Sequence, residues 1–309
     1  MLRAVLRGSR ALRKLAWGAV AVGVVTPLLR HRLRLRPPLV SALAWQSPIA
    51  LAVAAPRTPL RDAGIYALQM WAYFAHFDMP DDDPEALLAR LKVDYPARAD
   101  RVLGRGTHPT IRLQRALGRP GEIRPHDLAL SWVHWSWFFV PHGTLVYLLT
   151  RHREQYPRGA VLMSACFDLG CVVYWTVPTA PPWWAGENGN MPPVRRIMAE
   201  TGERFWGRLW APLYHSLERN PFAAMPSLHF GTSVMAARVL SGVGRKPGAL
   251  AWSYALTLGF GLVYLGEHYV VDLIAGGLLA EAIWRAAPRL EPWVKLAAGG
   301  IARLELPAG

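Results

Sequence analysis

The stretch Gly159–Pro178, GAVLMSACFDLGCVVYWTVP, contains 20 residues and one formal charge, on Asp168. A helix that crosses a bilayer needs about 20 consecutive apolar residues, so this stretch predicts a membrane span. Two further stretches have the same character, because Leu128–Leu149 and Gly248–Gly266 carry no formal charge. Three such stretches in 309 residues predict an all-α fold, a polytopic membrane helix bundle.

Two weaker spans follow the same pattern but contain charges. Leu228–Val243 includes Arg238, and Tyr269–Trp284 includes Asp272 and Glu281. Charged side chains inside a membrane are costly, so we expect these side chains either to face the interior of the bundle or to snorkel toward the membrane surface.

The N-terminal region is basic and apolar. Clusters of arginine flank the run Leu15–Leu29, which indicates an anchor or interfacial helix rather than a cleaved signal peptide. Leu39–Ala54 and Gly64–Phe77 are also apolar, and one or both are expected to span. We therefore divide the chain into four parts: basic anchor and apolar segments (1–59), a first core helix with an extramembrane amphipathic segment (60–127), a catalytic membrane bundle (128–287) and a C-terminal tail (288–309).

The charge balance favours a membrane role over nucleic-acid binding. The chain has 35 Lys and Arg residues against 21 Asp and Glu, and 52% of its residues are apolar. The basic residues cluster at the ends of the apolar stretches, which is typical of membrane orientation, so we expect no nucleic-acid partner. The two cysteines, Cys166 and Cys171, lie within one span and support neither a disulfide framework nor a thiolate metal site.

The basic residues also predict which connections are cytoplasmic. Arg151, Arg153 and Arg158 follow the first of the last five spans, and further basic residues surround 238–246 and 285–295. The connection at Glu267 and His268, together with the long 179–227 loop, is then expected on the extracytoplasmic side.

Two histidine-bearing segments fall on that side, MPSLHF at Met225–Phe230 and GEHYVVD at Gly266–Asp272. Pro226 and Ser227 suit the first positions of a helix, where free backbone N–H groups can cradle a phosphate. Ser227 is therefore a candidate substrate-binding residue, and His229 falls in the first helical turn.

The second segment has the spacing of a nucleophile and its orienting partner. His268 and Asp272 are four residues apart, so they share one face of a helix. A carboxylate bound to Nδ1–H fixes the tautomer, leaves Nε2 free to attack an electrophile, and stabilises the imidazolium that forms. His229 could then act as the general acid that protonates a leaving oxygen. Either segment alone is more often structural, and their placement on one membrane side favours the catalytic interpretation.

These segments resemble the second and third signature motifs of the type 2 phosphatidic acid phosphatase superfamily. More narrowly, they are similar to the branch of inositolphosphorylceramide synthases and inositol-phosphotransferase-like proteins. The Pro-Pro-Trp element at Pro181–Trp183 is similar to an element of that branch, and the resemblance covers roughly residues 93–277. It implies a six-helix membrane core, a phosphohistidine intermediate on His268, Asp272 as orienting group, His229 as acid, and neither metal nor cofactor.

The chain departs from the phosphatase pattern at its expected phosphate ligands. Gly261 and Leu262 occupy the positions where the third phosphatase motif has Ser-Arg, and the first motif is not found. We take Arg195 and Arg196 as candidate phosphate ligands, because a guanidinium fork suits phosphate oxygens.

The resulting hypothesis is an integral membrane enzyme of a bacterial cell membrane, with its site extracytoplasmic, that transfers or hydrolyses a phosphoryl or phosphoester group on a phospholipid or lipid phosphate. The alternatives are an inactive lipid-binding or scaffold protein of the same fold, motivated by the missing arginines, and a membrane metalloenzyme built on His126, Asp127, His134 and His142. For His134 and His142, packing is favoured over metal binding because no carboxylate within the span has matching helical spacing. The oligomeric state is left open.

Overall fold

The computed structural model describes residues 2–217 and 220–305. These residues form helices, turns and loops, with isolated backbone bridges but no strand among them. The prediction of an all-α membrane helix bundle is confirmed. Contacts divide the chain into two compact units, one up to Met79 together with the residues from Arg285 onward, and one from Pro80 to Trp284. The predicted four-part division stays a prediction.

The first unit is built on three long helices, α1 (Leu2–Leu29), α2 (Pro37–Ala54) and α3 (Pro59–Asp78). Helix α2 packs against both others. Gly23 allows a close approach, since a Cβ there would lie 2.6 Å from the carbonyl oxygen of Leu43. The part of α15 (Val270–Leu304) from Arg285 onward belongs to this unit. Glu305, which follows the helix, accepts from Arg57 Nε at 2.6 Å.

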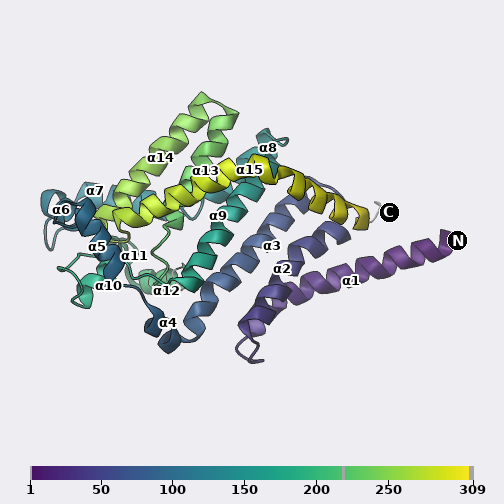
Figure 1. Ribbon diagram of the computed structural model, residues 1–309, viewed down its shortest axis with the longest axis horizontal. Helices are drawn as coiled ribbons and strands as arrows, with labels where there is room; N and C mark the ends of the chain where they lie inside the picture. Colours follow the sequence, from purple (N-terminus) through teal and green to yellow (C-terminus); the bar gives the residue numbers. More distant parts are fainter. Residues whose placement is uncertain (1, 218–219, 306–309) are drawn as a thin grey trace. The chain divides into compact units, whose positions relative to one another are not determined.

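The second unit contains most of the helices, and Figure 1 shows their order along the chain. The 3₁₀ turn η1 (Met79–Asp82) straddles the boundary between the units. The elements that follow it are α4 (Pro84–Arg90), α5 (Asp94–Leu103), α6 (Pro109–Leu117), α7 (Pro125–Ser136), α8 (Val140–Arg151), α9 (Tyr156–Thr176), α10 (Pro182–Glu187), α11 (Ile197–Trp206), η2 (Gly207–Leu209), α12 (Trp210–Leu217), α13 (Leu228–Val243), α14 (Arg245–Tyr264) and α15 (Val270–Leu304). The part of α15 from Arg285 onward lies in the first unit.

Within the part of the chain that the structure describes, three helices are long and apolar enough to cross a membrane: Ala11–Leu29, Pro37–Ala54 and Tyr156–Thr176. The last of these contains most of the predicted span Gly159–Pro178. Helix α2 qualifies although Pro48 lies inside it. Helices α13, α14 and α15, which are charged or less apolar, are not among these three. The count of six core spans stays a prediction.

The predicted single span Leu128–Leu149 is wrong in one respect, because the structure breaks it into α7 and α8. Proline has no amide hydrogen, so Pro141 cannot bond to the carbonyl of Trp137 and the helical pattern is interrupted there. The amides of residues 137–139 bond instead to carbonyls three residues back. The break sets the end of α7 apart from α8, and this end of α7 faces the site.

Helix α13 forms the centre of the second unit and packs against α8, α9 and α14. Gly170 of α9 permits this contact, because a Cβ there would lie 2.5 Å from a methyl carbon of Leu228. Three short backbone segments pair near the start of α13, with bridges between Lys92 and Thr179 and between Thr179 and Ala223. These pairings fix the segment that leads into α13.

Candidate active site

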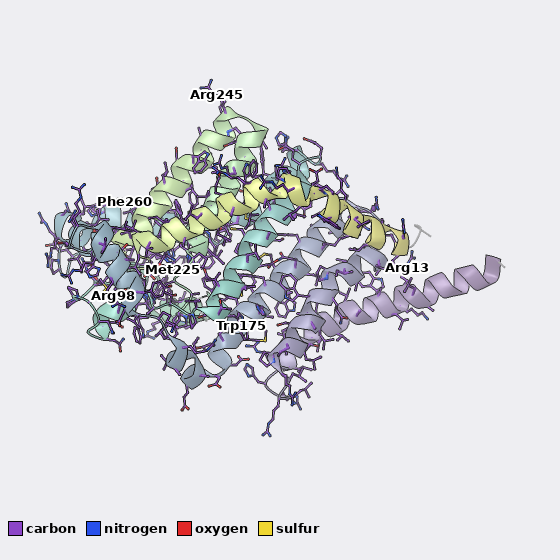
Figure 2. All side chains as sticks on the ribbon, in the orientation of Figure 1. Arg13, Arg98, Trp175, Met225, Arg245 and Phe260 are labelled. Atoms are coloured by element: carbon purple, nitrogen blue, oxygen red, sulfur yellow. The ribbon has the colours of Figure 1, made fainter. Side chains whose placement is uncertain are left out.

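The first histidine segment begins α13 as its sequence predicts. Ser227 is the N-cap, its Oγ accepts from the amide of Phe230 at 3.3 Å, and its side chain is buried. The Tyr174 hydroxyl of α9 donates to the carbonyl of Pro226 at 2.7 Å. His229 therefore lies in the first turn of α13 and is half-buried. Met225, which opens this segment, is labelled among the side chains of Figure 2.

The second histidine segment depends on a glycine turn between α14 and α15. Gly266 has φ +89°, a left-handed conformation that favours glycine, and a Cβ there would lie 2.8 Å from the carbonyl oxygen of Arg195. The amides of Glu267 and His268 both donate to the carbonyl of Leu262, at 3.0 and 3.2 Å. This turn ends α14 and directs His268 into the bundle.

Asp272 lies in the first turn of α15 and is fully buried. Its Oδ2 lies 3.3 Å from Nδ1 of His268 and accepts from the amide of Tyr269 at 2.9 Å. The predicted pairing of His268 with Asp272 is thus seen as a contact, and the carboxylate is held by a backbone donor as well as by the imidazole.

The two histidines meet across α13 and α15. Nδ1 of His229 lies 3.2 Å from Nε2 of His268, and the ring centroids are 5.3 Å apart. The helices approach closely at Gly276, since a Cβ there would lie 2.3 Å from the carbonyl oxygen of Ser227. The Ser227 amide also donates to the carbonyl of Asp272 at 3.0 Å. We call His229, His268 and Asp272 the histidine cluster.

Two side chains of the α7–α8 region surround His229. The rings of His134 and Trp137 have centroids 4.8 and 4.2 Å from its own. Trp137 Nε1 donates to Thr232 at 2.9 Å, whereas Nδ1 of the buried His134 has no hydrogen-bond partner among the described residues. The sequence favours a packing role for His134, and no local pattern indicates that either ring lies beside His229. His142 instead stacks on Phe167.

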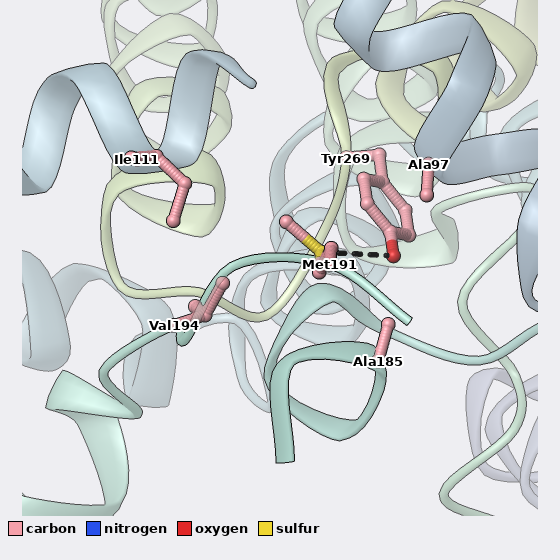
Figure 3. Close-up of a cluster of buried hydrophobic side chains, with 6 residues drawn as sticks. All are labelled: Ala97, Ile111, Ala185, Met191, Val194 and Tyr269. Carbon is pink, nitrogen blue, oxygen red and sulfur yellow. Dashed lines mark hydrogen bonds between the residues drawn. The ribbon is translucent and has the colours of Figure 1, made fainter. Parts of the chain in front are cut away.

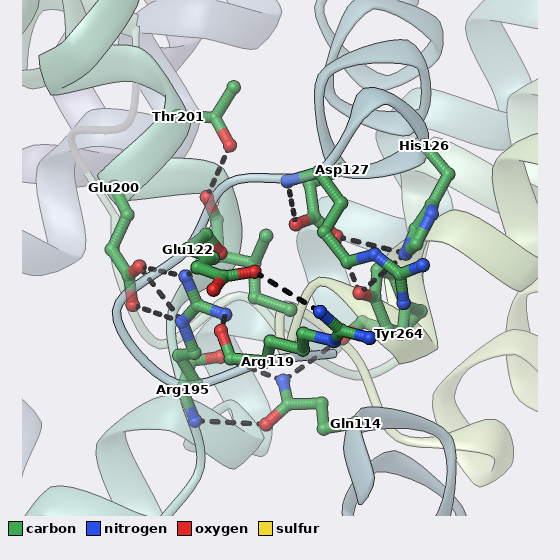
Figure 4. A network of polar contacts seen from close by, with 11 residues as sticks. Gln114, Arg119, Glu122, His126, Asp127, Arg195, Glu200, Thr201 and Tyr264 are labelled. Carbon is green, nitrogen blue, oxygen red and sulfur yellow. Dashed lines mark hydrogen bonds and ion pairs between the residues drawn. The ribbon is translucent and has the colours of Figure 1, made fainter. Parts of the chain in front are cut away.

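The two candidate arginines have different surroundings. Arg195 donates through Nε and Nη2 to Glu200, and through Nη1 and Nη2 to the carbonyls of Arg119 and Glu122. Glu200 raises the pKa of Arg195 by hydrogen bonding. These contacts form the network of Figure 4, to which Gln114 adds bonds to the backbone of Arg195. The described contacts of Arg195 are therefore structural, and a phosphate-binding role for it stays a prediction.

Arg196 contacts Glu267, the residue that precedes His268. Its guanidinium carbon is 3.7 Å from the ring centroid of Trp183 and 4.9 Å from that of Tyr214, and its Nε lies 3.4 Å from Oε1 of Glu267. Burial raises the pKa of Glu267, and the Arg196 charge opposes that shift. Because Glu267 directly precedes His268, Arg196 is the better placed of the two arginines for a substrate phosphate.

The Pro-Pro-Trp element joins these parts. The amide of Trp183 donates to the carbonyl of Gly266 at 3.2 Å, while its ring covers Arg196. One element therefore contacts both the glycine turn and the candidate phosphate ligand.

Side chains of the predicted extramembrane segment and of the region around α10 cover Tyr269, the residue that follows His268. Tyr269 is fully buried, and Figure 3 shows the apolar cluster around it, which draws on α5, α6, α10 and the loop after α10. The members of this cluster are Ala97, Ile111, Ala185, Met191, Val194 and Tyr269. The amphipathic segment thus packs directly over the start of α15.

The comparisons with known proteins identify the family. The model of the PAP2 superfamily, the type 2 phosphatidic acid phosphatases, matches residues 98–286, more than half of the chain. The chain belongs to the PAP2 superfamily, and with its apolar helices it is an integral membrane protein.

Two curated relatives support the narrower resemblance. The chain is 30% identical over 126 residues to the inositol phosphorylceramide synthase catalytic subunit of Schizosaccharomyces pombe, covering 39% of this chain and 30% of the relative. It is 30% identical over 121 residues to the inositol phosphorylceramide synthase of Candida albicans, covering 38% and 26%. The matched region thus spans less than a third of either relative. No solved structure matches the chain.

Proposed function

We propose that the protein transfers or hydrolyses a phosphoryl or phosphoester group on a phospholipid or lipid phosphate, with His268 as nucleophile. The observation that carries this proposal is the line of contacts from Asp272 through His268 to His229, at 3.3 and 3.2 Å. A nucleophile, its orienting carboxylate and a second imidazole at hydrogen-bond distance are the groups that such a transfer needs.

In the first step, the lone pair of His268 Nε2 forms a bond to phosphorus while the bond from phosphorus to the leaving oxygen breaks. His229 starts as the imidazolium, and its Nδ1–H gives the proton to the leaving oxygen. Asp272 accepts from His268 Nδ1–H and stabilises the positive charge that develops on the ring. The product is a phosphohistidine on His268 and a neutral alcohol, with His229 left as a base.

In the second step, a hydroxyl oxygen attacks phosphorus and the nitrogen–phosphorus bond breaks. His229 Nδ1 takes the proton of the attacking group, which returns both imidazoles to their starting states. Water as the acceptor gives hydrolysis, and a lipid or polyol hydroxyl gives transfer. The names of the two relatives favour transfer to a lipid hydroxyl.

The phosphate itself needs a positive partner, and Arg196 is our choice. Its cation lies between two aromatic rings and next to Glu267, so a dianionic phosphate could replace the carboxylate as its partner. Ser227, at the start of α13, is proposed to offer its helix end to the same phosphate.

The site is proposed to face the extracytoplasmic side, because the basic connections 151–158 and 238–246 lie at the other ends of the spans. Residence in a bacterial cell membrane stays a prediction from composition and resemblance.

The decisive experiment incubates purified protein with a panel of phospholipids, prenyl phosphates and inositol-containing donors, and identifies products by mass. A brief exposure to a substrate with a labelled phosphate, followed by an alkaline quench, is expected to trap label on His268. His268→Ala and Asp272→Ala variants that stay folded and fully active would disprove the mechanism. A wild-type protein that binds lipid but never turns over would favour the scaffold alternative, and loss of activity with a chelator would favour the metalloenzyme.

A further inference from the structure

A carboxyl group outside the histidine cluster, that of Asp100, is fully buried. Asp100 lies on α5, one helical turn after Ala97, and shares with it the face that packs over Tyr269. A carboxylate in apolar surroundings costs free energy unless donors or charges compensate it. The contacts of Asp100 therefore need an explanation.

One oxygen of this carboxyl group holds the start of the catalytic helix. Oδ1 accepts from the amide of Val271 at 3.2 Å, whereas Oδ2 is buried and has no hydrogen-bond partner among the described residues. Val271 directly precedes Asp272 and lies in the first turn of α15, whose amides have no partner within the helix. Asp100 thus accepts a hydrogen bond from a free amide in the first turn of α15. An N-cap side chain has the same role at the start of its own helix, whereas Asp100 lies on a different helix.

We propose that Asp100 is a positioning residue for the histidine cluster: it fixes the first turn of α15 and, when ionised, adds a second negative charge behind Asp272 and His268. This inference rests on the proposed function. A positive charge develops on the His268 ring as its Nε2 bonds to phosphorus, so a nearby negative charge lowers the free energy of that step. Asp272 contacts the ring directly, and Asp100 acts through the helix start and through its charge.

The surroundings of Asp100 make its charge depend on pH. Burial raises its pKa to about 6, the amide of Val271 opposes the shift, and the charge of Asp272 adds to it. The titratable groups that face Asp100 are Asp272 and Tyr269, both at the start of α15. The other elements packed here contribute apolar side chains, Ile111 from α6 and Met191 and Val194 from the loop after α10.

The test compares Asp100→Asn and Asp100→Glu with Asp94→Asn in the full-length protein reconstituted in lipid nanodiscs. Asp94 is a matched control because it is exposed and lies on the same helix. Turnover of phosphatidic acid is measured between pH 5 and 8.5, with kcat and KM separated. Infrared difference spectra between pH 5 and 7.5 report the carbonyl band of a protonated carboxylic acid, and this readout needs no activity.

We expect Asp100→Asn to lower kcat roughly 5- to 30-fold at pH 7.5, the effect of one charge at a helix start, with KM little changed. The variant should also lose the part of the fall in kcat at acidic pH that is centred near pH 6. Asp100→Glu should keep that decline at reduced kcat, and Asp94→Asn should match the wild type. The infrared band should disappear on raising the pH in the wild type and be missing from Asp100→Asn.

An Asp100→Asn protein with the kcat and pH profile of the wild type, or one that keeps the titrating infrared band, would overturn the proposal. If Asp100→Asn does not fold, the charge-retaining Asp100→Glu variant tests the proposal instead. A kcat of this variant that no longer falls at acidic pH would contradict the proposed role of Asp100. A wild type that turns over no lipid phosphate removes the proposed function, and the infrared band still tells whether Asp100 ionises there.

Discussion

Gly231 of α13 lies directly against Gly276 of α15, so closely that a Cβ on Gly231 would be 2.9 Å from the carbonyl oxygen of Gly276. The obstacle is backbone, which cannot rotate away as the end of a side chain can. Since His229 and Asp272 lie within a turn or so of this crossing, the two glycines set the separation of the histidine cluster.

Gly231→Ala is therefore expected to push α13 and α15 apart, to abolish most of the turnover and to cost about 1 to 3 kcal/mol of stability. Gly242→Ala is the matched control, because Gly242 is on the same helix and has nothing within 4 Å of the added carbon. Turnover and thermal unfolding of both variants check the prediction, which fails if the two behave alike.

The role of His229 as general acid predicts a dependence on the leaving group. His229→Gln should slow release of an alkyl alcohol by about 10²- to 10⁴-fold. Turnover of a nitrophenyl phosphate ester should fall far less, because nitrophenolate can leave without taking up a proton. Equal losses for both esters would show that His229 has another role, and His152→Gln serves as a control outside the cluster.

The two neighbouring arginines should respond differently to substitution. Arg196→Ala is expected to raise KM for a phosphorylated lipid about tenfold or more, since it would remove a charged hydrogen-bonding partner of phosphate. It should also cost stability, because the buried Glu267 loses its ion partner. Arg195→Ala should chiefly destabilise the protein by about 1 to 3 kcal/mol, because it leaves Glu200 and two backbone carbonyls without their donor. Steady-state kinetics and thermal unfolding separate these effects, and the reverse result would exchange the two roles.

The raised pKa of Asp100 also predicts how stability depends on pH. Between the ordinary value of 3.8 and about 6, the folded protein holds a proton that the unfolded chain has lost. This contribution to stability is therefore present at low pH and is lost as the pH rises through 6. At pH 7.5, Asp100→Asn should be more stable than the wild type by about 1 to 3 kcal/mol, although it is less active. Calorimetry at pH 5 and 7.5 checks the sign, and a variant less stable at both values contradicts it.

Local sequence patterns were enough to predict the parts of the site that lie on one helix or one turn. The spacing of His268 and Asp272 predicted their contact, and Pro226 with Ser227 predicted the start of α13. The apolar stretch around Asp168 predicted α9. In each case the cause is local, because helical periodicity and capping depend on neighbours in sequence.

The remaining features depend on residues far apart in the chain. Asp100 contacts Val271 across 171 positions of sequence, and His134 reaches His229 from another helix. Periodicity carries no information about such pairs. Pro141 lies at the break between α7 and α8, whereas the uncharged stretch of 22 residues around it predicted one span.

The contact between His229 and His268 has a consequence for the protein at rest. Two imidazole nitrogens 3.2 Å apart can share one proton, so each ring satisfies the other when no lipid is present. A ligand that binds between the two rings must first break this hydrogen bond. Only a ligand that offers an electrophile to His268 and a proton acceptor to His229 compensates for the loss, and a lipid without these groups does not.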